Sequence, residues 1–242
     1  MAGSCLLTGG ESMYKAIIFD LDNTLLDYSF SELDAMKRTL ADHRLFVDEE
    51  EQWEAFWNIF SQHNLRHWMD FVNNRGPHRS IQDVLISSFR DSLEADASQH
   101  ERLTASYWDY FCNTCYFENG ARDVLDFARV RYKLGIISNG IGEAQRRRLA
   151  AGEIFNLFHS VVVSDEVGIR KPRKEIFEYA LEELRLAPRD VLFVGDSLTD
   201  DYEGARNAGI DFCFYNRGKK DIADTHRPKY IVGELSELLD HL

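Results

Sequence analysis

Short runs of consecutive apolar residues recur along the chain, and each is followed directly by polar residues. An unbroken apolar run of this length is typical of a strand that is covered on both faces, as in a parallel sheet. The later runs are separated by segments with helical spacing, so strands and helices alternate, which predicts an α/β domain. The runs predicted as strands are Ala16–Phe19, Leu134–Ile137, Ser160–Val163, Val191–Val194 and Phe212–Tyr215.

Two helices in the C-terminal half have clear boundary signals. One is expected to begin after Pro172, because proline suits the first position of a helix. The other is expected to run from about Asp201 to Ala208 and to end at Gly209, a residue typical of the position just past a helix end. Residues of the first helix that recur at helical spacing are Ile176, Phe177, Ala180, Leu181 and Leu184.

More than a hundred residues separate the first predicted strand from the second, which is far too long for a single crossover helix. The intervening segment has helical spacing and little strand signal, and its clearest example is the set Trp53, Phe56, Trp57 and Phe60. We therefore expect an all-helical insertion, or cap, over residues 28–117 and a core of residues 13–27 and 118–242. Residues 1–12 are interpreted as a leader or tag.

Composition limits the classes of function. The chain has 242 residues, a net charge of −13 and a pI near 5.0. This excess of acidic residues argues against binding to a nucleic-acid polymer or a membrane surface, since both need a basic face. A small phosphorylated substrate is not excluded, because a bound cation can attract it. No apolar run approaches the roughly 20 residues of a membrane helix. Four scattered cysteines suggest no disulfide framework, which favours a cytoplasmic location.

Polar residues suited to catalysis or ligand binding stand out in four stretches, each just after a predicted strand or at a helix start. Asp20 and Asp22 come directly after the first strand, where one carboxylate can attack a phosphorus atom and the other can act as general acid and base. Ser138 and Asn139 follow the second strand and can donate hydrogen bonds to a phosphate. Taken alone, however, each pair would also be typical of an ordinary polar turn at the end of a strand.

Two further groups complete the set. Lys171 precedes a helix start and carries a charge suited to phosphate oxygens, although a solvated basic cluster is the commoner meaning of such a lysine. Asp196, Asp200 and Asp201 follow a buried strand and suit Mg²⁺, although acidic residues are also common at the start of a helix. Because ligands of open α/β sheets bind beyond the carboxyl ends of the strands, the four groups are expected to meet in one site.

The four groups together resemble the motifs of the haloacid dehalogenase (HAD) superfamily of hydrolases. The matching stretches are F-D-L-D-N-T-L, I-I-S-N-G, K-P and G-D-S-L-T-D-D, and the likeness spans about residues 14–216. The resemblance implies a doubly wound, Rossmann-like parallel sheet with an inserted helical cap. It also implies a phosphatase that works through an aspartyl-phosphate, since dehalogenases of this superfamily lack an aspartate at the position of Asp22.

The resemblance also implies a role for each residue. Asp20 would be the nucleophile and Asp22 the general acid and base. Lys171 would balance the charge of the nucleophile and the phosphoryl group. Thr24, Ser138 and Asn139 would bind phosphate together with Lys171, and Mg²⁺ would be held by Asp20, the Asp22 carbonyl, Asp196 and Asp201, with Asp200 as the alternative to Asp201.

The stretches that flank the motifs resemble bacterial pyrimidine 5′-nucleotidases, so we expect a nucleoside 5′-monophosphatase. The alternatives are a sugar-phosphate or phosphoglycolate phosphatase, a phosphomutase, and a non-catalytic binding protein on the same fold. The aromatic residues of the cap admit two interpretations, a hydrophobic core and a surface on which a base stacks. Monomer and homodimer both stay open.

Overall fold

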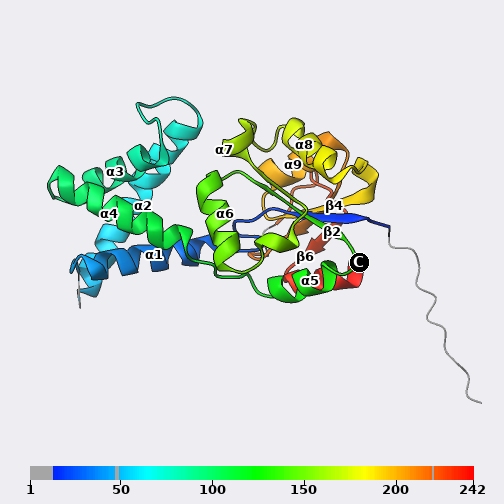
Figure 1. Ribbon diagram of the computed structural model, residues 1–242, viewed down its shortest axis with the longest axis horizontal. Coiled ribbons are helices and arrows are strands. Elements are labelled where there is room, and N and C mark those ends of the chain that lie inside the picture. The colour runs from blue at the N-terminus through cyan, green and yellow to red at the C-terminus, as the bar shows by residue number, and fades with distance from the viewer. Residues whose placement is uncertain (1–12, 47–48, 220) are drawn as a thin grey trace, which may run out of the picture. The chain divides into compact units, whose positions relative to one another are not determined.

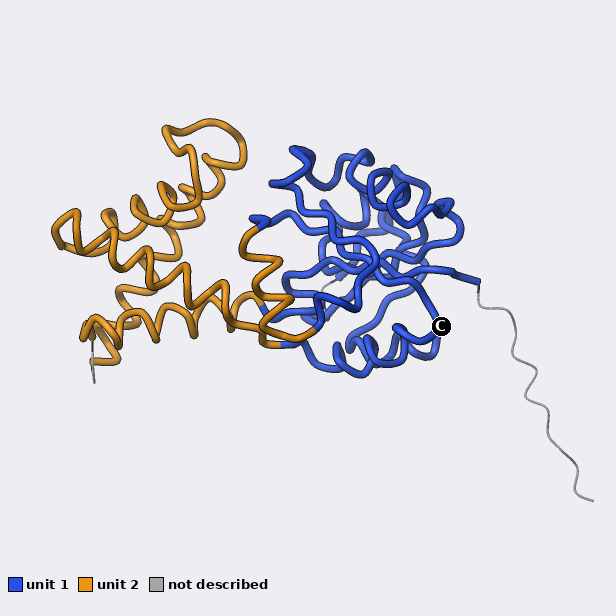
Figure 2. Tube along the Cα trace, viewed as in Figure 1, with its two compact units in different colours: residues 1–27, 117–142, 154–242 blue, residues 28–116, 143–153 orange. Residues whose placement is uncertain are grey.

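The computed structural model describes residues 13–46, 49–219 and 221–242 (Figure 1). The expected leader, residues 1–12, lies outside the described residues. The described chain divides into two compact units (Figure 2). The first unit holds residues up to 27, 117–142 and 154–242, and the second unit holds residues 28–116 and 143–153.

A parallel sheet is the centre of the first unit. Among the described residues it has six strands in the order β3-β2-β1-β4-β5-β6, and every neighbouring pair is parallel. Strand β1 is therefore central, and Phe19 at its end lies in register with Ile136 of β2 on one side and Val194 of β4 on the other. The strands are β1 (Ala16–Phe19), β2 (Lys133–Ser138), β3 (Ser160–Val163), β4 (Val191–Gly195), β5 (Asp211–Tyr215) and β6 (Tyr230–Val232).

The prediction of an α/β fold with a doubly wound parallel sheet is confirmed. All five predicted strands are present, and their observed bounds differ from the predicted ones by at most one residue. Strand β6 was missed. It has three residues, and Ile231 at its centre is 52% exposed, so it lacks the buried apolar run that marks the others.

Helices pack against the sheet of the first unit. In α8 (Lys174–Leu184) all five apolar residues predicted from helical spacing are buried. The predicted helix that ends at Gly209 begins instead as a π-helical turn, η3 (Leu198–Tyr202), and continues as α9 (Glu203–Ala208). The other helices of this unit are α5 (Ala121–Ala128), η1 (Phe155–Leu157), α7 (Ser164–Val167), η2 (Pro188–Asp190) and η4 (Leu235–His241).

The second unit is helical. Segment 28–116 forms α1 (Tyr28–Asp42), α2 (Glu50–Val72), α3 (Ile81–Ser92) and α4 (Ala97–Cys112). Its core contains the aromatic residues of α2, since Phe60 is fully buried and lies 4.9 Å from the ring of Phe89 and 6.0 Å from that of Tyr107. Most of the aromatic residues that recur at helical spacing in the sequence therefore pack in the core of this unit.

Residues 143–153 group with the second unit, although the sequence assigned them to the core. They belong to α6 (Gly142–Ala151) and the turn after it. The reason is side-chain packing: the fully buried Arg148 places its guanidinium 4.8 Å from the centre of the Phe111 ring, and Arg147 pairs with Asp109 at 2.6 Å. Phe117, the last residue of the expected cap, lies in the first unit.

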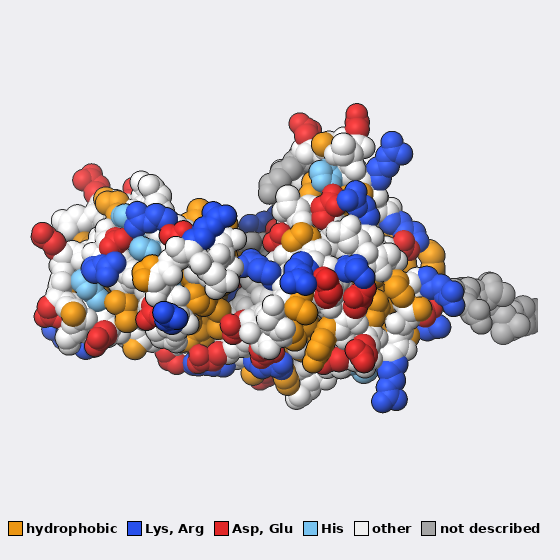
Figure 3. All heavy atoms as spheres, turned by 90° about the horizontal axis from the view of Figure 1, so that it is seen from above, with side chains coloured by type: hydrophobic (Ala, Val, Ile, Leu, Met, Phe, Trp, Pro, Cys, Tyr) orange, Lys and Arg blue, Asp and Glu red, His pale blue; other side chains and the backbone are white. Residues whose placement is uncertain are grey.

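The outer surface carries both signs of charge. On the face seen in Figure 3, acidic and basic side chains are interspersed on both units. No helix among the described residues combines the length and the apolar character needed to cross a membrane.

Gly204 in α9 is tightly enclosed, and we predict that Gly204→Ala destabilises the protein. Alanine normally favours a helix by about 1 kcal/mol over glycine. Here, however, a Cβ would overlap the ring of Phe177 and would lie 3.3 Å from the Cα of Pro172. We expect the free energy of unfolding to fall by about 1–3 kcal/mol in urea denaturation. The control is Asn207→Ala, at an exposed position of the same helix. A Gly204→Ala protein as stable as the control would contradict the packing argument.

Candidate active site

Asp20 lies at the carboxyl end of the central strand and is held from three directions. Its backbone N–H donates to the carbonyl of Val194 on β4, at 2.8 Å. One carboxylate oxygen, Oδ2, accepts a hydrogen bond from the Thr24 hydroxyl at 3.0 Å, and the other, Oδ1, accepts one from the Lys171 ammonium at 2.6 Å. The side chain is only 8% exposed. Its position and both its oxygens are therefore fixed before any ligand arrives.

Lys171 is the buried cation of this site. Its Nζ contacts Oδ1 of Asp20 and Oδ1 of Asp201, each at 2.6 Å, and also donates to the carbonyl of Ile137 at 3.0 Å. Only 2% of its side chain is exposed. The ammonium thus joins the ends of β1 and β2 to the turn that follows β4.

Three carboxylates gather around this cation. One oxygen from each of Asp20, Asp196 and Asp201 lies within 4.8 Å of the other two. Asp201 is 1% exposed, and its Oδ2 accepts a hydrogen bond from the backbone N–H of Ser197 at 3.0 Å. A Cβ at Gly195 would overlap the Asp201 carboxylate, so glycine at that position leaves the space that the carboxylate fills.

The charges in the cluster suit a divalent cation. Burial raises the pKa of Asp20, Lys171 opposes that shift, and the carboxylates of Asp201 and Asp196 add to it. Burial alone would lower the pKa of Lys171, but Asp20 and Asp201 outweigh it, so this pKa is raised and the ammonium stays charged. Three carboxylates around one ammonium leave excess negative charge, and carboxylate oxygens are the ligands that Mg²⁺ prefers.

Asn139 has a second role that the sequence did not indicate. Its side-chain oxygen accepts from the backbone N–H of Lys171 at 2.8 Å, and its side-chain nitrogen donates to the carbonyl of Lys171 at 3.0 Å. The same nitrogen donates to Asp200 at 3.2 Å. Asn139 therefore positions the backbone of Lys171. Asp201, rather than Asp200, joins the carboxylate cluster, as the helical register favours.

The two remaining predicted residues lie at the same edge of the sheet. Ser138 is the buried last residue of β2, directly beside the central strand. Asp22 is half-exposed, in a turn in which the N–H of Asn23 donates to the carbonyl of Leu26 at 2.7 Å. The carboxylate cluster of the described residues holds Asp20, Asp196 and Asp201, and the Asp22 side chain is not part of it.

Comparison with known proteins identifies the family. The model of the haloacid dehalogenase-like hydrolases matches residues 14–209, which include every residue of the cluster. The chain belongs to this family. Membership agrees with the resemblance inferred from the four motifs.

Named relatives of this HAD hydrolase are nucleotidases and phosphatases. Pyrimidine 5′-nucleotidase YjjG of Escherichia coli is 29% identical over 92% of this chain and 95% of the relative. A glyceraldehyde 3-phosphate phosphatase of Methanopyrus kandleri is 27% identical over 94% of this chain and 97% of the relative. Among solved structures, the HAD-hydrolase YfnB of Bacillus subtilis, bound to magnesium, has a TM-score of 0.76 at 26% identity and covers 95% of this chain and 98% of its own.

Gly195 gives a direct test of the carboxylate arrangement. We predict that Gly195→Ala lowers the apparent affinity for Mg²⁺ at least about tenfold, because the new Cβ displaces Asp201 from its partners. The measurement is the dependence of activity on Mg²⁺ concentration, supported by calorimetry. Gly233→Ala is the control, since a Cβ there meets Glu237 only at 3.9 Å, an ordinary contact. Equal Mg²⁺ dependence in both variants would show that Asp201 does not support the ion.

Proposed function

We propose that this HAD hydrolase is a Mg²⁺-dependent phosphatase that cleaves small phosphate monoesters through an aspartyl-phosphate on Asp20. The observation that carries the proposal is the buried contact of Lys171 with Asp20 and Asp201, each at 2.6 Å. An ammonium buried in this way opposes the rise in the pKa of Asp20 that burial and the neighbouring carboxylates cause, and it leaves positive charge where a phosphoryl group would arrive.

The proposed reaction has two steps. In the first, a carboxylate oxygen of Asp20 attacks phosphorus, the bond to the ester oxygen breaks, and Asp22 gives its proton to the leaving alkoxide. In the second, Asp22, now a carboxylate, takes a proton from water, and the water oxygen attacks phosphorus. Inorganic phosphate leaves and the Asp20 carboxylate is restored.

The other site residues orient the Asp20 carboxylate and offset the negative charge of the phosphoryl group. The Thr24 hydroxyl holds one oxygen of Asp20 at 3.0 Å. Ser138 and the Asn139 backbone would donate to the phosphoryl oxygens, in addition to the role of the Asn139 side chain in positioning Lys171. Asp20, the carbonyl of Asp22, Asp196 and Asp201 would hold Mg²⁺, which supplies positive charge that offsets the charge of the phosphoryl group.

The proposed substrates are nucleoside 5′-monophosphates. The likeness around the motifs and the relative named a pyrimidine 5′-nucleotidase support this choice. Several aromatic residues of the second unit are buried in its core, but Trp57 and Trp68 are only half-buried. Stacking of a base on such a ring is worth about 1–3 kcal/mol, or roughly five- to 150-fold in binding. A second candidate is a three-carbon sugar phosphate, because relatives of similar identity are named glyceraldehyde 3-phosphate phosphatases.

We predict that Asp20→Asn removes activity, by at least about a thousandfold, because an amide cannot form the acyl-phosphate. The assay is release of phosphate from p-nitrophenyl phosphate with Mg²⁺. Wild-type enzyme quenched in acid during turnover should carry phosphate on the peptide that contains Asp20. The control is Asp126→Asn, which makes the same chemical change at an exposed carboxylate of α5. Substantial activity in a folded Asp20→Asn protein would reject the mechanism.

We predict that kcat/KM is higher for nucleoside monophosphates than for glyceraldehyde 3-phosphate, phosphoglycolate and hexose phosphates. Stacking tolerates different bases, so several nucleotides should be accepted. The measurement is kcat/KM across this panel under one set of conditions. If any sugar phosphate or phosphoglycolate exceeded every nucleotide by about tenfold, the nucleotidase proposal would fall, and the aspartyl-phosphate mechanism would still stand.

A further inference from the structure

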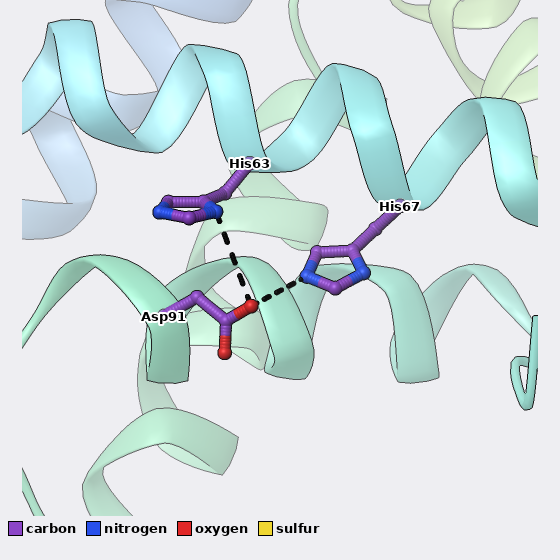
Figure 4. A group of neighbouring side chains, drawn as sticks. All are labelled: His63, His67 and Asp91. Carbon is purple, nitrogen blue, oxygen red and sulfur yellow. Dashed lines mark hydrogen bonds and ion pairs between the residues drawn. The ribbon is translucent and has the colours of Figure 1, made fainter.

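A second group of potential metal ligands lies within the helical unit and is not part of the sequence motifs of the family. His63 and His67 lie one turn apart on α2, and Asp91 lies near the end of α3 (Figure 4). Both imidazoles point toward the Asp91 carboxylate (Figure 4). Nε2 of His67 is 2.9 Å from Oδ2 of Asp91, and Nδ1 of His63 is 3.9 Å from the same oxygen.

These distances fit a small cation with nitrogen and oxygen ligands. One ligand atom from each of the three residues lies within 4.8 Å of the other two. Zinc bonds nitrogen and oxygen at about 2.0–2.2 Å in a tetrahedron, which places neighbouring ligand atoms about 3.3 Å apart. The observed separations of 2.9 and 3.9 Å lie on either side of that value, so small side-chain rotations would suffice.

An ion from solvent can reach the three ligands. The side chains of His63, His67 and Asp91 are between 10% and 29% exposed.

His78, in the segment between α2 and α3, supplies a supporting contact. Its Nε2 lies 3.0 Å from Nδ1 of His67. In one tautomer His67 donates its Nδ1 proton to His78, which leaves the Nε2 lone pair directed at the side where Asp91 lies. A hydrogen bond to the second ring nitrogen is the usual arrangement that orients a metal-bound histidine.

We propose that His63, His67 and Asp91 form a binding site for Zn²⁺ or a similar first-row transition-metal ion, distinct from the carboxylate cluster of the first unit. Two imidazoles and one carboxylate are a ligand set that selects such ions over Mg²⁺, which prefers oxygen ligands alone. The ion would cross-link α2 to α3 and so stabilise the helical unit.

Arg66 allows a variant that should change the metal affinity in the opposite direction to a ligand variant. Its guanidinium donates to Oδ2 of Asp91 at 2.8 Å, and its side chain is 55% exposed. It therefore competes with a cation for that oxygen. Removing Arg66 should tighten metal binding, whereas removing a ligand should weaken it. Misfolding cannot produce these opposite effects.

The experiment is calorimetric titration of the full chain with Zn²⁺ in excess Mg²⁺, repeated with Co²⁺ to record its visible absorption bands. We expect one Zn²⁺ per chain at the cluster, at least about tenfold weaker binding in His63→Gln, and about twofold to fivefold tighter binding in Arg66→Gln. The matched control is His43→Gln, a histidine of the same unit whose Nε2 contacts Ser106. This control should bind as the wild type does.

A second readout is the unfolding temperature, which Zn²⁺ should raise in the wild type and in His43→Gln but not in His63→Gln. Circular dichroism without metal checks that each variant is folded. If the wild type binds no Zn²⁺, or if His63→Gln and His43→Gln bind it equally, the three side chains are only a hydrogen-bonded contact between two helices and the proposal is overturned.

Discussion

The buried ammonium of Lys171 is the interaction on which the site depends. Removing an ion from water costs several kcal/mol, and the cost is met only when partners of opposite charge stand close by. Lys171 has two such partners, Asp20 and Asp201, each at 2.6 Å. Those carboxylates are themselves almost fully buried, with 8% and 1% of their side chains exposed, so the three groups have one another as close polar partners. The nucleophile, the cation and a carboxylate suited to metal are thus stabilised as one group.

The order of the strands brings this group together from distant parts of the chain. Asp20 and Lys171 are 151 positions apart in sequence, yet they share a hydrogen bond. Because β1 lies between β2 and β4, residues that follow these three strands meet at one edge of the sheet. Lys171, in the segment between β3 and α8, reaches the same edge, where its ammonium contacts the carbonyl of Ile137 on β2. This is the point where the strand order reverses, which is where open α/β sheets bind their ligands. The sheet therefore fixes the site geometry, and the short loops only complete it.

The sequence predicted the sheet well because its strands are buried on both faces, which leaves a continuous apolar signal for all but the exposed β6. It also indicated the group of Asp20, Lys171, Asp196 and Asp201, because each of these residues lies just after a predicted strand or at a helix start. It did not predict that the side chain of Asn139 binds the backbone of Lys171, since that contact depends on the three-dimensional path of two loops. It did not indicate that residues 143–153 of α6 and the turn after it would group with the helical unit, because a helix that begins after a strand gives no sign of the neighbours against which it will pack.

Because residues 143–153 group with the helical unit, that unit consists of two separate segments of the chain. The chain passes between the two units four times, at residues 27–28, 116–117, 142–143 and 153–154. A chimaera that exchanged only segment 28–116 would leave Arg148, fully buried here, without the Phe111 ring it stacks on. Exchange of the helical unit with that of a relative therefore requires segments 28–116 and 143–153 to be transplanted together.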